Sequence, residues 1–260
     1  MCTKSTASVT VAITAMTDPE GFYRQDLAST HDEGFTVAAQ NAAIKTLEEL
    51  IRLGLTEGTV ADLGCGSGTL LASMDEAGYG VFGVDISEDM IDLARKRVPA
   101  GSFVVDSILS VDLPECLAVT ATAEVLNYMV DEHNGPAARA ELFQRIYEAL
   151  VPDGFFLFDV AGPIRAPEAG SVLGFSEGPG WAVLLKLEVD ETQRNLTHHI
   201  TSFRQVGELY RRDYEVHRQQ LVEPEEIVDS LSKAGFKTEL LTNYGDMVLP
   251  DGLVGFLASK

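Results

Sequence analysis

Three glycines alternate with other residues immediately after a short apolar run. Gly64, Gly66 and Gly68 follow Val60–Leu63, and a second apolar segment, Leu70–Met74, comes next. Glycine adopts backbone dihedrals that are closed to other residues and lets a ligand approach the chain closely. A helix that begins here would direct its free N–H groups toward that ligand. The stretch therefore predicts a buried strand, a tight turn and a helix that together bind a ligand.

Two carboxylates accompany these glycines. Asp62 precedes Gly64 by two residues, and Asp85 ends the next apolar run, Val81–Val84. A carboxylate accepts strong, charge-assisted hydrogen bonds from ligand hydroxyls. Thr69 stands where the nicotinamide and flavin fingerprint GxGxxG would place its third glycine, which argues against a dinucleotide site.

An acid-x-Gly-x-Gly-x-Gly motif with a second acid at the end of the next strand resembles the class I S-adenosylmethionine-dependent methyltransferases. Leu150-Val151-Pro152-Asp153-Gly154, which precedes an aromatic-rich strand, is a further resemblance to that family. The resemblance implies that Asp85 accepts hydrogen bonds from both ribose hydroxyls, that Met90 lies against the adenine ring, and that Asp106-Ser107 meets the adenine amino group. We therefore expect S-adenosyl-L-methionine as the cofactor, bound by Tyr23, Asp62, Gly64, Gly66, Gly68, Asp85, Ile86, Met90, Asp106, Ser107 and Ala123.

Strand and helix patterns alternate along most of the chain, which is the signature of a doubly wound parallel sheet. Strands are expected at about 59–63, 81–85, 102–105, 117–123, 155–160, 237–243 and 253–258, with helices at about 35–53, 67–77, 88–97, 137–150 and 223–233. The fold class is α/β, a Rossmann-like sheet of seven strands that is mostly parallel. The resemblance implies that the last strand runs antiparallel.

A second block of alternating residues interrupts this pattern. Residues 161–180 are rich in Gly, Pro and Ala and read as a loop, and three β-like runs follow at 181–189, 196–206 and 208–222. They predict an antiparallel β-meander inserted after strand five. The expected organisation is a flexible tail (1–18), a lid helix and the cofactor-binding half of the sheet (19–160), a loop and meander roof over the acceptor (161–222), and the last helix and strands (223–260). Tyr23 and His31 are candidates for the lid.

Methyl transfer depends mainly on alignment of donor and acceptor, and a base is needed only when the acceptor must lose a proton. Histidine suits that role near neutral pH. Glu215 and His217 lie two positions apart on a predicted strand and so share a face. His217 is the candidate base, Glu215 its orienting partner, and Tyr128 shapes the floor of the site. The alternative is that this face is the exposed polar side of an edge strand.

The charge composition narrows the classes of partner that we expect for this chain. With 40 acids against 19 Lys and Arg, the formal charge of −21 repels nucleic acid. We expect a small-molecule acceptor, no membrane partner, and a monomer or homodimer. Base- and glutamine-modifying methyltransferases carry Asn/Asp-Pro-Pro-aromatic after strand four, whereas this chain has Ala123-Glu124-Val125-Leu126. That departure favours small-molecule O-, N- or C-methylation.

The three cysteines, at positions 2, 65 and 116, have no metal-ligand spacing. Adjacent His198 and His199 would point to opposite faces of a strand, so they cannot share an ion. We predict no metal and a reducing, cytoplasmic location. A non-catalytic S-adenosylmethionine-binding module and, less favoured, a nucleotide-dependent oxidoreductase stay open. The identity of the acceptor is not encoded in any recognisable motif.

Overall fold

The computed structural model describes residues 21–166, 171–190, 192 and 194–260. Its larger sheet has seven strands in the order β10-β13-β5-β4-β1-β2-β3. Their bounds are β1 Thr59–Leu63, β2 Gly80–Asp85, β3 Ser102–Val105, β4 Cys116–Ala121, β5 Leu150–Ala161, β10 Lys237–Leu241 and β13 Leu253–Ser259. The strands from β5 to β3 pair in parallel, and β13 runs antiparallel to both β5 and β10. The predicted fold class, including the antiparallel last strand, is confirmed.

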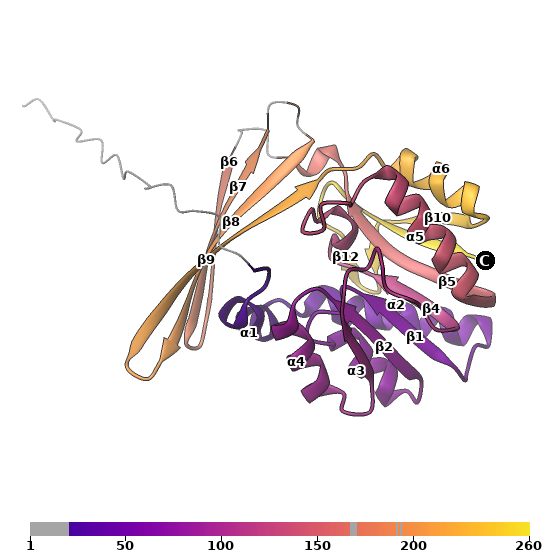
Figure 1. Ribbon diagram of the computed structural model, residues 1–260, viewed down its shortest axis with the longest axis horizontal. Coiled ribbons are helices and arrows are strands. Elements are labelled where there is room, and N and C mark those ends of the chain that lie inside the picture. Colours follow the sequence, from indigo (N-terminus) through magenta and orange to yellow (C-terminus); the bar gives the residue numbers. More distant parts are fainter. Residues whose placement is uncertain (1–20, 167–170, 191, 193) are drawn as a thin grey trace, which may run out of the picture.

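Helices cover both faces of this sheet because side chains alternate along each strand (Figure 1). The helices are α2 Val37–Leu53, α3 Thr69–Glu76, α4 Glu88–Arg97, α5 Pro136–Ala149 and α6 Pro224–Ala234. Val60 packs in one core cluster with residues of α2, α3 and α4, whereas its neighbour Ala61 packs in a second cluster with residues of α5 and α6. The carboxyl ends of β1 to β4 are left uncovered by these helices and can form a site.

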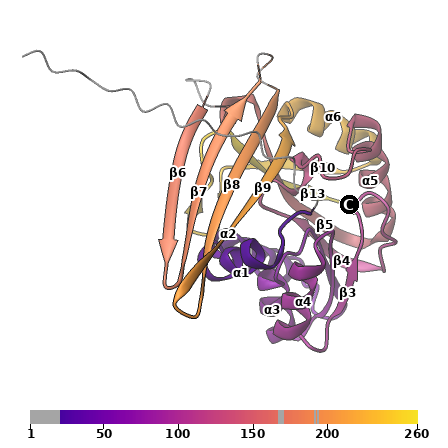
Figure 2. The same ribbon diagram turned by 60° about the vertical axis from the view of Figure 1, so that its left-hand side comes forward.

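A second, antiparallel sheet stands beside the first. Its order is β6-β7-β8-β9, with bounds Ser171–Gly178, Trp181–Val189, Asn195–Val206 and Leu209–Gln220. Helix α1, Gln25–Gly34, lies between this sheet and the larger one (Figures 1 and 2). Leu27 of α1 packs on Trp181, Val183 and Ile200, so the inner face of the small sheet is covered. An inserted antiparallel sheet after strand five is thus confirmed.

Two segments differ from the prediction. The stretch 161–180 is not all loop, because β6 pairs with β7 along its whole length. Most side chains of β6 are exposed and Gly174 interrupts it, so it carries no clear alternation. Residues 29–34, which precede the helix expected at 35–53, are also helical and belong to α1, whose buried residues Leu27, Ala28 and Thr30 define one face.

Smaller differences lie near the chain's end and its beginning. Strand six ends at Leu241, and a short hairpin of β11 Asn243–Tyr244 and β12 Met247–Val248 follows it. The predicted tail, 1–18, lies outside the described residues. In the part of the chain that the structure describes, no helix is both long and apolar enough to span a bilayer.

Candidate functional site

The three glycines of the loop after β1 adopt left-handed backbone conformations. Gly64, Gly66 and Gly68 have φ values of 71°, 52° and 77°. A Cβ on Gly64 would stand 2.6 Å from a methyl of Val125, so the loop packs directly against the segment after β4. A Cβ on Gly66 would meet only the Met90 sulfur, at 3.9 Å. Gly66 therefore leaves open space on the side where a ligand would lie.

Asp85, at the end of β2, fixes this loop to the start of α4. The Gly66 N–H donates to its Oδ2 and the Ser87 N–H to its Oδ1, each at 2.9 Å. Ser87 in turn caps α4, because its Oγ accepts from the Met90 N–H at 3.2 Å. Burial raises the pKa of Asp85, and the backbone donors oppose that effect. Each carboxylate oxygen retains a further lone pair for a ligand hydroxyl.

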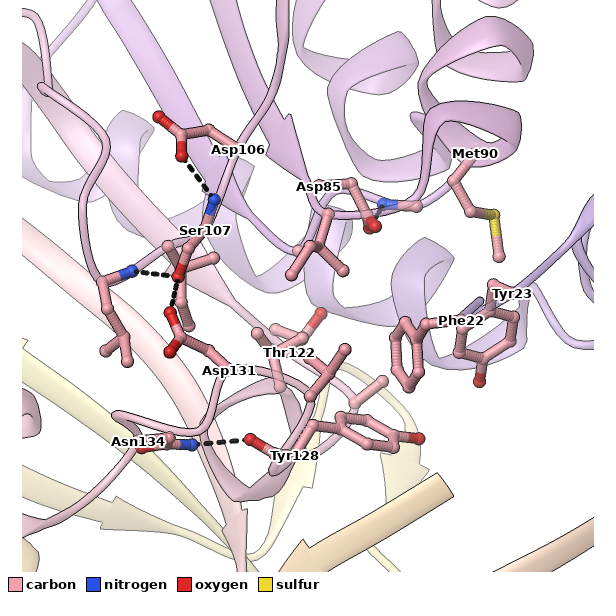
Figure 3. Close-up of a pocket in the computed structure, with 18 of the residues that line it drawn as sticks. Phe22, Tyr23, Asp85, Met90, Asp106, Ser107, Thr122, Tyr128, Asp131 and Asn134 are labelled. Atoms are coloured by element: carbon pink, nitrogen blue, oxygen red, sulfur yellow. Dashed lines mark hydrogen bonds between the residues drawn. The ribbon is translucent and has the colours of Figure 1, made fainter. Parts of the chain in front are cut away.

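A cavity opens at the carboxyl ends of β1 to β4 (Figure 3). Asp85 and Met90 approach it from one side, and Asp106 and Ser107 from the loop after β3. Its lining is completed by Phe22, Tyr23, His31, Gly64, Gly66, Ile86, Ile108, Leu109, Thr122, Ala123, Val125, Tyr128, Val130, Asp131 and Asn134. The lining combines apolar walls with a few carboxylates, as a small-molecule site does.

The segment after β4 turns sharply at two left-handed residues. Ala123 and Glu124 have φ values of 64° and 63°, so the strand ends at Ala121, two residues earlier than predicted. Their N–H groups donate to the buried carboxyl of Asp159, at 3.0 and 2.6 Å. Burial raises the pKa of Asp159 to about 6. This turn directs Tyr128 into the cavity.

Asp62 faces β4 and not the cavity. Its Oδ1 accepts a hydrogen bond from the Thr120 hydroxyl at 2.6 Å, and desolvation raises its pKa to about 7. Gly68 also lies outside the cavity lining and packs against Ala94 of α4, which a Cβ would approach to 3.1 Å. Both residues therefore support the glycine loop without lining the cavity.

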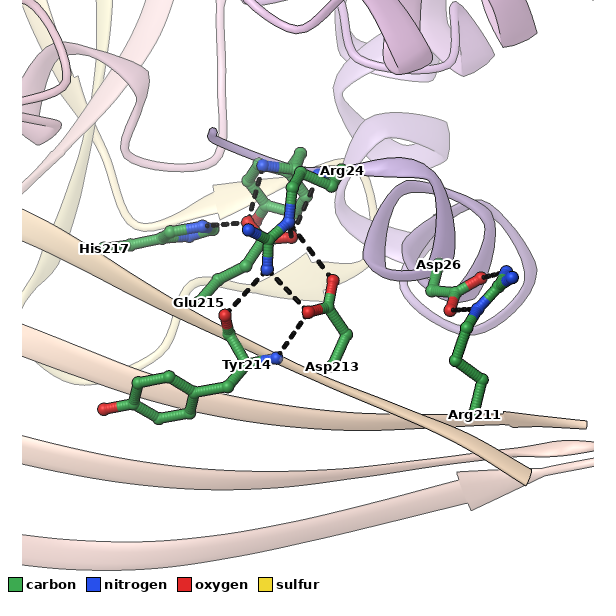
Figure 4. Close-up of polar contacts among 8 residues, drawn as sticks. Arg24, Asp26, Arg211, Asp213, Tyr214, Glu215 and His217 are labelled. Atoms are coloured by element: carbon green, nitrogen blue, oxygen red, sulfur yellow. Dashed lines mark hydrogen bonds and ion pairs between the residues drawn. The ribbon is translucent and has the colours of Figure 1, made fainter. Parts of the chain in front are cut away.

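Residues 22–24, named here the N-terminal strap, join the small sheet to the cavity, which Phe22 and Tyr23 line. Figure 4 shows Arg24 of the strap beside Asp213 and Glu215 of β9. The N–H groups of Tyr23 and Arg24 donate to the two carboxylate oxygens of Glu215, at 2.7 and 2.9 Å. The Arg24 guanidinium pairs with Asp213 at 2.6 Å. On the other side, the Ser87 hydroxyl donates to the Tyr23 carbonyl at 2.8 Å. The strap thus connects β9 to the start of α4.

Glu215 also holds His217. The His217 Nε2 lies 2.8 Å from Oε2 of Glu215, while its Nδ1 is buried and has no hydrogen-bond partner among the described residues. Both side chains are about 1% exposed, so the alternative of an exposed polar strand face is wrong for this pair. His217 does not line the cavity. Its ring contacts Phe22 and Tyr23, which do, at centroid distances of 4.2 and 4.8 Å.

Comparisons with known proteins agree with this geometry. The family described as "Methyltransferase domain" matches residues 60–154. The putative methyltransferase YqeM of Bacillus subtilis is 26% identical over 226 residues, covering 84% of this chain and 88% of that protein. An S-adenosylmethionine-dependent methyltransferase structure from Clostridium acetobutylicum superposes with a TM-score of 0.76 at 17% identity, over 89% of this chain and 96% of that one. The KedS8 sugar N-methyltransferase from Streptoalloteichus has a TM-score of 0.74 at 20% identity, over 95% and 98%.

Residues 60–154 thus match the methyltransferase-domain family, and the fold of the chain is that of the S-adenosylmethionine-dependent methyltransferases. S-adenosylmethionine is the cofactor of this family. In this methyltransferase, the cavity gathers most residues predicted for the cofactor, which are Tyr23, Gly64, Gly66, Asp85, Ile86, Met90, Asp106, Ser107 and Ala123. It also brings in His31 and Tyr128.

Sequence reasoning missed several residues of the methyltransferase cavity. Asp131 accepts a hydrogen bond from the Ser107 hydroxyl, and that bond together with the His133 N–H lowers the pKa of Asp131. Asn134 donates to the Tyr128 carbonyl at 2.7 Å. Both lie between the strand expected to end at about 123 and the helix expected from about 137, where no element was predicted, although Asn and Asp near a Gly-Pro pair are typical of ordered turns. Among the described residues, no group of three or more His, Cys, Asp or Glu could hold a metal ion.

Proposed function

We propose that this methyltransferase transfers the methyl group of S-adenosylmethionine to an O, N or C atom of a small molecule. The proposal rests on one observation. Asp85, the glycine loop and Tyr128 all line the same cavity at the carboxyl ends of β1 to β4. Two structural neighbours support the acceptor class. KedS8 is described as a sugar N-methyltransferase, and CalS10, which has a TM-score of 0.72 at 18% identity, as an amino pentose methyltransferase.

The chemistry of the residues that line the cavity matches each of them to a part of the cofactor. Asp85 accepts from the ribose hydroxyls with the lone pairs that its backbone donors leave free. Met90 offers a polarisable thioether to the adenine ring. The loop of Asp106 and Ser107 faces the adenine edge. Transfer is then an in-line displacement, in which most of the acceleration comes from fixing donor and acceptor in line.

We further propose that His217 takes the proton from those substrates that must be deprotonated before methyl transfer. Glu215 is its positioning residue. A carboxylate only accepts hydrogen bonds, so contact with Glu215 places the His217 proton on Nε2 and leaves a lone pair on Nδ1. That lone pair is buried without a partner. Because the Phe22 ring lies against the His217 ring, with centroids 4.2 Å apart, proton transfer requires Phe22 to move aside.

Transfer of labelled methyl from S-adenosylmethionine into a metabolite extract tests the function. Label in a small-molecule fraction is the expected result, and label only in RNA, DNA or protein would overturn the small-molecule proposal. Cofactor binding without transfer to any fraction would favour the non-catalytic module.

With an acceptor in hand, His217→Ala should lower turnover by about 10²–10⁴-fold and leave cofactor affinity within a factor of a few, since a base acts in the chemical step. His199→Ala is the matched control. It removes a histidine from the opposite face of the neighbouring strand, where its ring meets Glu188 and Tyr214. Unchanged turnover in His217→Ala, with an acceptor that must lose a proton, would remove His217 from the chemistry. A parallel loss of cofactor affinity would assign the pair to holding the strap.

A further inference from the structure

A second cavity of about 300 Å³ lies between α1 and the inner face of the small sheet. Its walls are mostly apolar and include Leu27 and Phe35 on the helical side and Val183, Leu185 and Ile200 on the sheet. Its lining in the described part of the chain contains no Asp, Glu, Lys or Arg. A charged group placed there would lose its hydration without an ionic partner, so the cavity suits an uncharged, largely apolar occupant.

This cavity adjoins the cofactor cavity. Tyr23 and His31 line both, so the two spaces share one wall. The rings of these residues meet edge to face, with centroids 5.2 Å apart. A molecule in the second cavity would therefore contact two residues that also line the cofactor cavity.

A histidine of the second cavity has a ring nitrogen without a partner in the part of the chain that the structure describes. His198 lines the cavity, and its Nε2 is buried there with no hydrogen bond. Its neighbour His199 differs, because its two ring nitrogens meet Tyr214 and Glu188 on the other face of the sheet at 2.6 and 2.7 Å. Burial also lowers the pKa of His198 to about 4, so the ring is neutral near pH 7. A buried polar atom left unpaired is costly, and an occupant with one polar group would remove that cost.

The register places His198 beside the proposed proton acceptor. His198 stands directly opposite His217 across β8 and β9, and opposite Leu187 across β7 and β8. Directly opposed residues of antiparallel strands point to the same face. The inner face of the small sheet thus changes from apolar at β7 to polar at β9, and His198 marks the boundary.

We infer that this second cavity takes the methyl acceptor, and that the acceptor presents an uncharged apolar ring or chain to α1 and β7 and a hydroxyl or an uncharged aromatic amine to His198. The inference rests on the proposed methyl transfer. It adds a substrate class and a residue that selects for the polar group.

Binding of two small probes tests this inference. Equilibrium dialysis would compare 2-naphthol with naphthalene against the full chain saturated with S-adenosylhomocysteine. Both probes should bind, and 2-naphthol should bind roughly fivefold or more tightly because it pairs with His198. His198→Leu should abolish that preference while naphthalene still binds. His199→Leu, on the opposite face, should retain it.

A filling variant keeps the test decisive if His198→Leu does not fold. Ser176 lines the cavity from β6, and Ser176→Phe should exclude both probes while S-adenosylhomocysteine still binds. Equal affinity of the two probes, a preference that survives His198→Leu, or binding unaffected by Ser176→Phe would each overturn the inference alone. Failure of the wild-type chain to bind S-adenosylhomocysteine would overturn the proposed function and the inference with it.

Discussion

Replacing Asp85 with Asn tests the centre of the cofactor site. The substitution keeps the shape of the side chain, removes its charge, and replaces one acceptor oxygen with an NH₂ donor. In the folded chain both oxygens already accept a backbone N–H at 2.9 Å, so one of these bonds is lost together with one position for a ribose hydroxyl. A hydrogen bond to a charged group contributes about 1.5–3 kcal/mol, so cofactor affinity should fall by about 10- to 150-fold.

The free energy of unfolding should change much less. Loss of a charge-assisted hydrogen bond destabilises the fold, but the pKa of Asp85 is raised by burial, so removing its charge relieves a desolvation cost. We expect a net change within about 1 kcal/mol. Cofactor binding and stability are therefore separable in this variant.

Isothermal calorimetry with S-adenosylmethionine and S-adenosylhomocysteine measures the affinity. Asp92→Asn is the matched control, since it makes the same change of charge on the exposed face of α4, where Asp92 pairs with Arg95 at 3.6 Å. Its affinity should stay within about threefold of wild type. If Asp85→Asn binds as tightly as Asp92→Asn, Asp85 does not contact the cofactor. An equal loss in both variants would trace the effect to net charge.

Two further predictions concern stability. Burial lowers the pKa of His31 to about 4 from an ordinary 6.5. The stability that the neutral ring contributes is therefore present above pH 6.5 and is lost as pH falls from 6.5 to 4, where the unfolded chain binds the proton first. Urea unfolding across that window should show that His31→Gln removes up to about 3 kcal/mol of the wild-type decline in the free energy of unfolding. Asp62 titrates in the opposite direction in both proteins and cancels in the comparison, and an identical decline in both would refute the assignment. Gly64→Ala and Gly54→Ala both introduce a Cβ at a φ of 71°, but only the first meets a neighbour, at 2.6 Å, so Gly64→Ala should unfold more easily by about 1–3 kcal/mol beyond the control and lose cofactor affinity. Equal destabilisation would show that backbone strain alone makes glycine necessary at 64.

The parts of the fold that were predicted correctly depend on short-range patterns. The glycine loop and Asp85 lie within a few residues of the elements that they connect, so their spacing carries the information. Strand β6 depends instead on its partner β7, and its own residues, mostly exposed and interrupted by Gly174, do not alternate clearly. The cytoplasmic location and the oligomeric state stay predictions.

The features of the site also divide into those that follow from a local pattern and those that depend on long-range contacts. Parity along one strand correctly brought Glu215 and His217 together, because that relation is local. The burial of the pair follows from the strap, whose Tyr23 and Arg24 lie 192 and 191 residues from Glu215 in the sequence. No pattern within one segment reports a contact of that range. The sequence could therefore identify the candidate residues, whereas Phe22 covering His217 became visible only in the folded chain.

Two buried carboxyls near the cavity carry a desolvation cost that the cofactor can offset. Desolvation raises the pKa of Asp62 and Asp85, and the negative charge of Asp85 raises that of Asp62 further. Hydrogen bonds from the Thr120 hydroxyl and from backbone N–H groups offset only part of this cost. Each oxygen of Asp85 keeps a lone pair for a ribose hydroxyl of the proposed cofactor. Hydrogen bonds to the charged form of a carboxyl lower its pKa. Cofactor binding should therefore lower the pKa of Asp85 and offset more of the cost of its burial.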